Sequence, residues 1–213
     1  MKNVPGFIAG FRDFQKKYFC SNHELFDRLK KRQSPTTMLI SCCDSRVEPG
    51  ALLGAEPGDL FITRNIAGLV PPYGPDKGLH GVSAALEYAV KFLKVENIIV
   101  LGHSNCGGIR ALTSPAGGDE GEFITPWVRI ARDALAKADE RFPDREGEAH
   151  QRACELAAIL VSLENLLTFP WIRERVDRDE LHITGWYFDM QKGALLGYSA
   201  EERGFFPVVP KCT

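Results

Sequence analysis

The chain has 213 residues, of which 44% are hydrophobic and 25% are charged, close to the average of folded globular proteins. This length and composition predict one compact domain and exclude an intrinsically disordered chain. The formal net charge of −2 gives no basic field for nucleic acid, and no apolar stretch nears the roughly 18 residues of a transmembrane helix, so we expect neither partner.

The cysteines and the N-terminus together indicate a compartment. The first 20 residues lack the apolar core and the small-residue cleavage site of a secretory signal. Six cysteines in a chain of this length, without such a signal, predict free thiols rather than a disulfide framework. We therefore expect a cytoplasmic protein whose thiols are available for metal binding or catalysis.

The N-terminal segment predicts two helices. Phe7, Phe11, Phe14 and Tyr18 fall at helical spacing with basic residues between them, which is typical of an amphipathic helix. Because this helix is terminal, the core that its aromatic face covers can belong to a second subunit. A second short helix is expected over residues 23–32.

Three short apolar runs predict buried parallel strands. They cover residues 36–42, 59–63 and 97–102, and they carry few charges. Residues 81–95, between the last two runs, keep an apolar period near 3.6 and predict a crossover helix. A strand, a helix and a parallel strand form a right-handed βαβ unit.

The second half of the chain adds helices and two further strands. Residues 123–142 and 148–169 have helical patterns, and each pattern ends at a proline. Residues 181–189 and 193–199 are strand-like and predict a hairpin or a neighbouring pair. The whole pattern predicts one α/β domain with peripheral helices.

Two polar motifs follow the first and the third predicted strand. One is Ser41-Cys42-Cys43-Asp44-Ser45-Arg46, and the other is Gly102-His103-Ser104-Asn105-Cys106-Gly107-Gly108. Ligands of open parallel sheets bind beyond the carboxyl ends of the strands. The fold can therefore bring the two motifs together.

The residue types of these motifs predict a zinc site. Thiolate and imidazole favour Zn²⁺ over Mg²⁺ or Ca²⁺, and Cys42, His103 and Cys106 give a set of three ligands that leaves a fourth position open. Adjacent residues at a strand end point to opposite sides, so only one of Cys42 and Cys43 faces the metal, and spacing does not choose between them. Inert buried thiols and a structural zinc site are the competing interpretations, while a redox dithiol lacks a Cys-x-x-Cys motif.

The two motifs together resemble those of the β-class carbonic anhydrases, and most closely their plant-type branch. The matching stretches are Cys42-x-Asp44-Ser45-Arg46, His103-x-x-Cys106-Gly107-Gly108, Gln33-Ser34-Pro35, Pro57-Gly58-Asp59-Leu60-Phe61, Arg64-Asn65, Glu87-Tyr88 and Ser162-Leu163-Glu164-Asn165-Leu166-Leu167. The resemblance implies a mainly parallel β-sheet with flanking helices and N-terminal helices that extend onto a partner subunit. It also implies a homodimer or a higher, even-numbered assembly, with an N-terminal arm over 1–33, a zinc-binding core over 36–200 and a tail over 201–213.

The resemblance assigns a role to each site residue. It places one zinc ion per subunit on Cys42, not Cys43, together with His103 and Cys106. Asp44 and Arg46 match the catalytic dyad of the family. Gln33 matches a substrate-binding glutamine, and Phe61, Ile66 and Tyr88 match the lining of the pocket.

The implied reaction is the reversible hydration of carbon dioxide to bicarbonate and a proton by a zinc-bound hydroxide. Asp44 would accept the remaining proton of the hydroxide, and Arg46 would hold Asp44 in place. Relatives of this fold hydrolyse carbon disulfide or carbonyl sulfide, and the ligands alone do not separate these activities. A zinc-stabilised scaffold without activity is the third hypothesis, since fold alone does not establish function.

Position 39 predicts which state the metal centre adopts. In part of the family the counterpart of Asp44 becomes a fourth zinc ligand, and that branch has a noncatalytic bicarbonate pocket with a tryptophan three residues before the first zinc cysteine. Here that residue is Leu39, which offers neither an indole N–H nor an aromatic face. We therefore expect Asp44 paired to Arg46, an open fourth position, and no second bicarbonate site beside Leu39 and Arg64.

Overall fold

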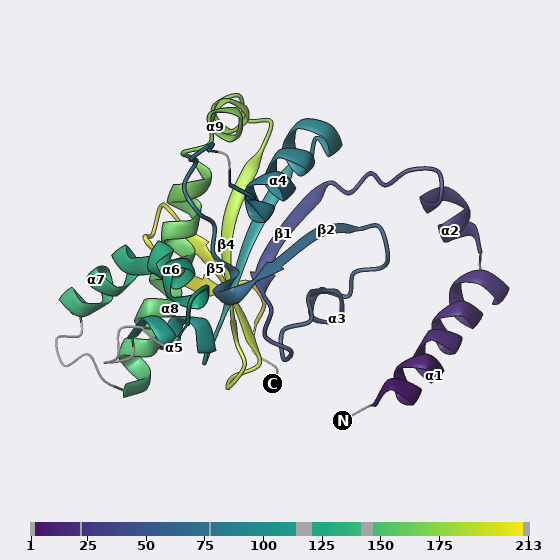
Figure 1. Cartoon of the computed structure of the whole chain (residues 1–213), viewed down its shortest axis with the longest axis horizontal. Coiled ribbons are helices and arrows are strands. Elements are labelled where there is room, and N and C mark those ends of the chain that lie inside the picture. The colour runs from purple at the N-terminus through teal and green to yellow at the C-terminus, as the bar shows by residue number, and fades with distance from the viewer. Residues whose placement is uncertain (1–2, 22, 77, 114–120, 142–146, 211–213) are drawn as a thin grey trace. The chain divides into compact units, whose positions relative to one another are not determined.

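The structure is a computed structural model that describes residues 3–21, 23–76, 78–113, 121–141 and 147–210. Contacts between Cα atoms divide the chain into two compact units, Met1–Ser34 and Pro35–Thr213. Figure 1 labels the helices and strands of each unit.

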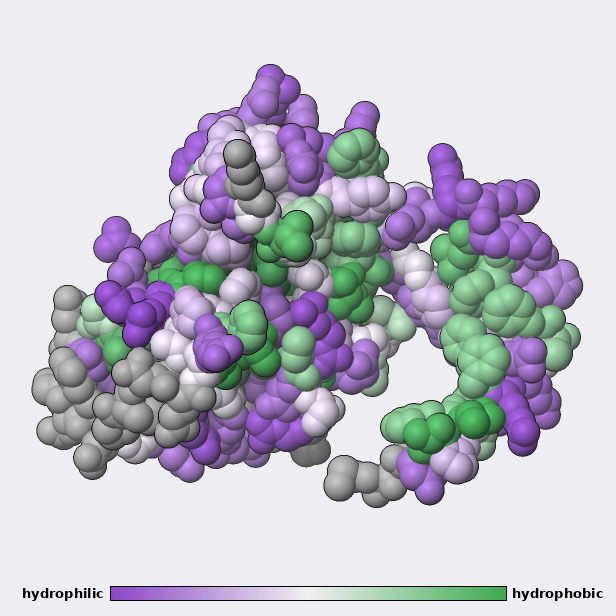
Figure 2. All heavy atoms as spheres, viewed as in Figure 1, coloured by the Kyte–Doolittle hydropathy of each residue, from purple (hydrophilic) through white to green (hydrophobic). Residues whose placement is uncertain are grey.

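The N-terminal unit consists of helices with a shared aromatic face. Helix α1 (Val4–Gln15) continues as a π-helical turn (Lys16–Ser21), and α2 (Glu24–Leu29) follows. Ring contacts join Phe14, Tyr18, Phe19 and Phe26. Phe7 and Phe11, by contrast, remain 63% and 61% exposed, and apolar side chains follow one side of this unit in Figure 2. The unit therefore covers only part of its own aromatic face.

One six-stranded sheet organises the described residues of the second unit. Its strands are β1 (Thr37–Cys42), β2 (Leu60–Asn65), β3 (Asn97–His103), β4 (His182–Asp189), β5 (Ala194–Ser199) and β6 (Gly204–Pro207). The strand order is β2-β1-β3-β4-β5-β6. The first four strands pair in parallel, whereas β5 pairs antiparallel with β4, and β6 pairs antiparallel with β5. The expected α/β fold with a mainly parallel sheet is confirmed.

The central strands are mainly apolar because both faces of the sheet are covered. On β1, Met38 and Ile40 face one hydrophobic cluster, which also contains residues of α8 and α9. Leu39 faces a second cluster with Leu52 and Leu53 on the opposite side. Successive side chains of a strand alternate between faces, so neither face of β1 can carry polar residues without burying them.

Helices flank the sheet and hold the loops that follow its strands. They are α3 (Pro49–Leu53), α4 (Gly81–Glu87) with a π-helical continuation (Tyr88–Leu93), α5 (Gly107–Thr113), α6 (Ile124–Val128), α7 (Arg132–Arg141), α8 (Gly147–Leu166) and α9 (Pro170–Asp177). Figure 1 shows α5, α6, α7 and α8 grouped together beside the sheet. Buried side chains from these four helices form a third hydrophobic cluster that includes Cys42 and Cys106.

The helical pattern over 123–142 does not form one continuous helix. Within it, α6 is followed by a 3₁₀ turn (Arg129–Ala131) and then by α7, and residue 142 lies outside the described residues. The tight 3₁₀ turn between α6 and α7 accounts for the break. Among the described residues no single helix is long and apolar enough to cross a membrane, and only the bent pair of α8 and α9 passes that test by length and composition.

Candidate metal centre

The three expected ligands meet at the carboxyl ends of two neighbouring parallel strands. Cys42 ends β1 and His103 ends β3, and these strands pair directly. Cys106 lies three residues further on, just before α5. One ligand atom from each of the three buried residues lies within 4.8 Å of the other two. Cys43, next in the chain to Cys42, is exposed and is not part of this cluster.

The protonation of His103 fits a metal ligand. Its Nδ1 lies 2.9 Å from the carbonyl oxygen of Ser104, which can only accept, so Nδ1 carries the proton. Nε2 of the neutral ring is then left with a free lone pair. This atom is buried and has no hydrogen-bond partner among the described residues. A buried, unpartnered nitrogen between two thiols is the arrangement that a metal cation satisfies.

The two cysteines are also placed as zinc ligands. Their sulfur atoms are 4.0 Å apart, and two thiolates bound to one tetrahedral zinc ion at about 2.3 Å each would be about 3.8 Å apart. The Cys106 thiol can donate a hydrogen bond to Cys42, which lowers the pKa of Cys42 to about 4. The same contact raises the pKa of Cys106, so the pair by itself favours one thiolate and one thiol. A divalent cation allows both to ionise, and the donor set therefore fits zinc.

Asp44 lies beside the ligands but is held by Arg46. Asp44 Oδ1 accepts hydrogen bonds from Arg46 Nε at 2.9 Å and from the Arg46 backbone N–H at 3.0 Å, and Oδ2 accepts from Arg46 Nη2 at 2.6 Å. These bonds hold the pKa of Asp44 well below its ordinary range. Oδ2 also lies 4.0 Å from Nε2 of His103. The carboxylate thus faces the metal centre without joining the three-ligand cluster.

Arg64 fixes the backbone that connects Cys42 to this dyad. Its guanidinium donates to the carbonyl oxygens of Cys42, Asp44 and Val47 at 2.6–3.0 Å and to the Glu48 carboxylate at 2.9 Å. The sequence connected Arg64 only with a second bicarbonate site, which we expected to be absent. Because the guanidinium of Arg64 is engaged by four acceptors, we assign it to positioning of the loop.

The loop from His103 to Cys106 is anchored at each residue after the histidine. Ser104 donates its backbone N–H to the carbonyl oxygen of Phe188 in β4. Asn105 has a positive φ of 55°, and its carbonyl oxygen accepts from Arg46 at 3.0 Å. The backbone N–H of Cys106 donates to Glu155 Oε1 at 3.0 Å. The site thus depends on contacts far apart in the sequence.

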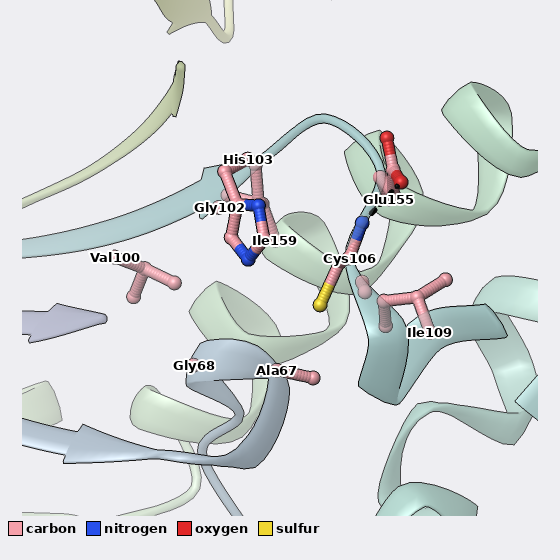
Figure 3. A pocket seen from close by; sticks show the side chains of 10 residues that line it. Ala67, Gly68, Val100, Gly102, His103, Cys106, Ile109, Glu155 and Ile159 are labelled. Carbon is pink, nitrogen blue, oxygen red and sulfur yellow. Dashed lines mark hydrogen bonds between the residues drawn. The ribbon is translucent and has the colours of Figure 1, made fainter. Parts of the chain in front are cut away.

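A small enclosed cavity of about 10 Å³ adjoins the ligands. Figure 3 shows its lining, which comprises Ala67, Gly68, Val100, Gly102, His103, Cys106, Ile109, Glu155, Ala158 and Ile159. Gly68, with a φ of +64°, allows the turn after β2 to pass close to β1, because a Cβ there would lie 3.2 Å from the backbone N of Cys42.

The residues expected to line the pocket differ in how close they lie to the metal ligands. Ile66 lies close to the ligands, since its side chain packs against Gly108, two residues after Cys106. Its carbonyl oxygen accepts a hydrogen bond from Trp127 Nε1 at 2.8 Å. Phe61 and Tyr88 contact each other at a ring distance of 5.9 Å. Phe61 pairs with Met38 on β1, four residues before Cys42. Gln33 belongs to the N-terminal unit.

A mainly parallel α/β sheet with two buried cysteines and one buried histidine at its strand ends fits a zinc-binding enzyme, in which three protein ligands would leave a fourth coordination position for water or substrate. Comparisons with known proteins specify the class. The family model described as carbonic anhydrase matches residues 37–195. Two curated relatives from Arabidopsis thaliana are similar: beta carbonic anhydrase 3 is 42% identical over 192 residues, and beta carbonic anhydrase 5, chloroplastic, is 42% identical over 180 residues. The alignments cover 87% and 84% of this chain but 72% and 59% of the two relatives.

Solved structures agree with this assignment. The β-carbonic anhydrase CcaA superposes with a TM-score of 0.90 at 32% identity, over 97% of this chain and all of that one. One of two tetrameric β-carbonic anhydrases of Sordaria macrospora superposes with a TM-score of 0.74 at 29% identity, over 91% of this chain and 92% of that one. The chain belongs to the β-carbonic anhydrase family, which confirms the resemblance seen in its motifs.

Proposed function

We propose that the chain catalyses the reversible hydration of carbon dioxide to bicarbonate and a proton. The observation that carries the proposal is the open constellation at the strand ends. Cys42, His103 and Cys106 can hold one zinc ion, while Asp44 is paired to Arg46 and stays outside this set. A zinc ion bound there supplies a Lewis acid that lowers the pKa of a water in its fourth position.

The residues of the chain would orient the reaction around that position. The Asp44 carboxylate, whose Oδ2 lies 4.0 Å from His103 Nε2, would accept a hydrogen bond at Oδ2 from the attacking oxygen and so direct a lone pair of that oxygen toward carbon dioxide. Arg46 fixes the direction of this carboxylate and links it to the backbone of Asn105. The apolar side chain of Ile66 would exclude water from one wall, which suits a small nonpolar substrate.

The substrate roles of Gln33, Phe61 and Tyr88 remain part of the proposal. Tyr88 is 43% exposed, and its ring contacts that of Phe61. We infer that these residues contribute to a pocket that is completed in an assembly. The exposed aromatic face of α1 supports a homodimer or a larger even-numbered assembly in which the N-terminal helices extend onto a partner, and a relative in Sordaria macrospora is described as tetrameric.

A cytoplasmic location is likewise proposed. The five cysteines within the described residues are all free, as expected in a reducing compartment. One relative carries the description chloroplastic, so the location of this chain needs its own measurement. Neither the family match nor the relatives support hydrolysis of carbon disulfide or carbonyl sulfide, or a scaffold without activity.

A stopped-flow hydration assay with a pH indicator tests the proposed function. The purified chain should contain one zinc ion per subunit and accelerate hydration above the buffer rate. Removal of zinc with a chelator should abolish the acceleration, and added Zn²⁺ should restore it. A zinc-loaded chain that hydrates carbon dioxide no faster than buffer would contradict the proposal.

A further inference from the structure

Glu155 is a buried carboxylate at the metal centre that the proposed reaction does not use. It belongs to α8 and is 3% exposed. It lines the enclosed cavity together with Ala158 and Ile159, which lie on the same face of the helix. In Figure 3 its carboxylate lies beside the backbone of Cys106, with the hydrogen bond drawn between them.

Both oxygens of Glu155 accept hydrogen bonds from neutral donors. Oε1 accepts from the backbone N–H of Cys106 at 3.0 Å and from Gln151 Nε2 at 2.8 Å. Oε2 accepts from the hydroxyl of Tyr187 at 2.7 Å. Burial and the adjacent carboxylate raise the pKa of Tyr187, so this phenol remains a donor. Among the residues that the structure describes, no lysine or arginine forms an ion pair with Glu155.

A buried carboxylate such as Glu155 destabilises the folded protein unless a positive charge lies near it. Burying a carboxylate without a cation carries a large desolvation penalty, which neutral hydrogen bonds offset only in part. The backbone N–H of Cys106 could be bound by a neutral acceptor of the same shape, such as a glutamine. Arg152 and Lys192 line a pocket together with Glu155, but both pair with Asp189. The buried cluster of Cys42, His103 and Cys106, whose Cys106 contacts Glu155, fits a divalent cation and offers a place for a compensating positive charge.

We propose that Glu155 is a positioning residue of the zinc centre. Its carboxylate fixes the backbone of Cys106 through a charge-assisted hydrogen bond, so that the sulfur stays where it can bind the metal together with Cys42. Its negative charge also favours a cation in the centre through Coulomb attraction. This inference rests on the proposed function, because it concerns the affinity of the same metal site for zinc.

The substitutions Glu155→Gln and Glu155→Ala separate charge from contact. Glutamine keeps the volume and an acceptor oxygen but removes the charge, whereas alanine removes both. Glu148→Gln is the matched control, since Glu148 lies two turns earlier on α8 and is exposed. Tyr187→Phe is the second test, because it removes the donor to Oε2 and leaves the Cys106 contact in place.

Competition with a chromophoric chelator measures the zinc dissociation constant of each variant. We expect an increase of about tenfold for Glu155→Gln and up to about a hundredfold for Glu155→Ala, the range found when partners of metal ligands are removed. Tyr187→Phe should show a smaller increase than Glu155→Ala. Glu148→Gln should stay within about twofold of the wild type, as surface substitutions do.

The absorption of the cobalt-substituted chain distinguishes positioning from folding alone. Both Glu155 variants should change the thiolate-to-metal charge-transfer band, and Glu148→Gln should not. Wild-type zinc affinity in both Glu155 variants would overturn the inference, as would a lowered affinity with an unchanged cobalt spectrum. A wild-type chain that binds no zinc would overturn the proposed function and this inference with it. If Glu155→Ala does not fold, Glu155→Gln and Tyr187→Phe decide between these outcomes.

Discussion

Replacement of the adjacent cysteines one at a time should separate the ligand from its neighbour. Cys42 is 5% exposed, and its sulfur lies 4.0 Å from that of Cys106, whereas Cys43 is exposed. Cys42→Ser and Cys106→Ser each replace a thiolate with a neutral hydroxyl, which is a poor zinc ligand. Loss of a residue that only supports a ligand weakens metal binding by about tenfold to a hundredfold.

Loss of a ligand itself should therefore weaken zinc binding by more than about a hundredfold, which corresponds to more than about 2.7 kcal/mol. Cys43→Ser should stay within about twofold of the wild type, since nothing buried is removed. Metal analysis after dialysis against a chelator measures the zinc content of each variant, and circular dichroism confirms that each is folded. Zinc retained in Cys42→Ser but lost in Cys43→Ser would reverse the ligand assignment. Zinc retained in all three variants would refute the three-ligand site.

Two further predictions concern the dyad and the N-terminal unit. Arg46→Ala removes the contacts that hold Asp44, so carbon dioxide hydration should fall by about a hundredfold, as a displacement near 1 Å can cause. The zinc content measured by metal analysis should change little. Near-wild-type turnover would remove Arg46 from the mechanism. The double variant Phe7→Glu and Phe11→Glu places two charges on the exposed aromatic face of α1. Light scattering should then show a smaller assembly than in the wild type, because charged residues are depleted in the core of an interface. An unchanged mass would exclude this face from the interface between subunits.

The sequence predicted the central strands because burial on both faces leaves a strong signal. The apolar runs at 36–42 and 97–102 correspond to β1 and β3 within one residue at each end. Helix α9 was missed because Pro170 was taken as the end of a helix, whereas it occupies the first turn of the next one. Two short elements, α3 and β6, have five and four residues, which is too short for a periodic pattern.

The sequence predicted the types of residue that form the metal centre, but not the residues that hold its ligands in place. Spacing left Cys42 and Cys43 equivalent, and only the packing of β1 shows which sulfur faces His103. The roles of Arg64 and Glu155 depend on contacts with residues up to 22 and 49 positions away in the chain, respectively. A signal for Glu155 was present, because it is an acidic residue on an apolar stripe that continues with Ala158 and Ile159. A charged residue at such a position is retained when it has a partner.

The contacts of Leu39 and Arg64 lead to a last prediction, on inhibition by bicarbonate. Leu39 is fully buried among Val47, Ile99 and Leu101, and it leaves no polar wall for an anion. Arg64 already donates to three carbonyl oxygens and to Glu48, so an anion could bind it only by displacing these acceptors. Bicarbonate should therefore inhibit only at the metal centre, without cooperativity.

Initial hydration rates over a bicarbonate series test this prediction, with Arg64→Ala as the informative variant. Hydrogen bonds to charged groups contribute about 1.5–3 kcal/mol each, so loss of the guanidinium should lower the free energy of unfolding by about 2 kcal/mol or more in urea titrations. It should leave the shape of the inhibition curve hyperbolic, because the side chain supports the loop and binds no inhibitor. A sigmoidal curve in the wild type that becomes hyperbolic in Arg64→Ala, without loss of stability, would show that Arg64 serves a second anion site. A crystal structure at about pH 7.5, near the pKa of about 7 typical of water bound to catalytic zinc, is a further test. Asp44 bound to zinc would contradict the expected open state of the metal centre, and bicarbonate beside Leu39 would show a second anion site.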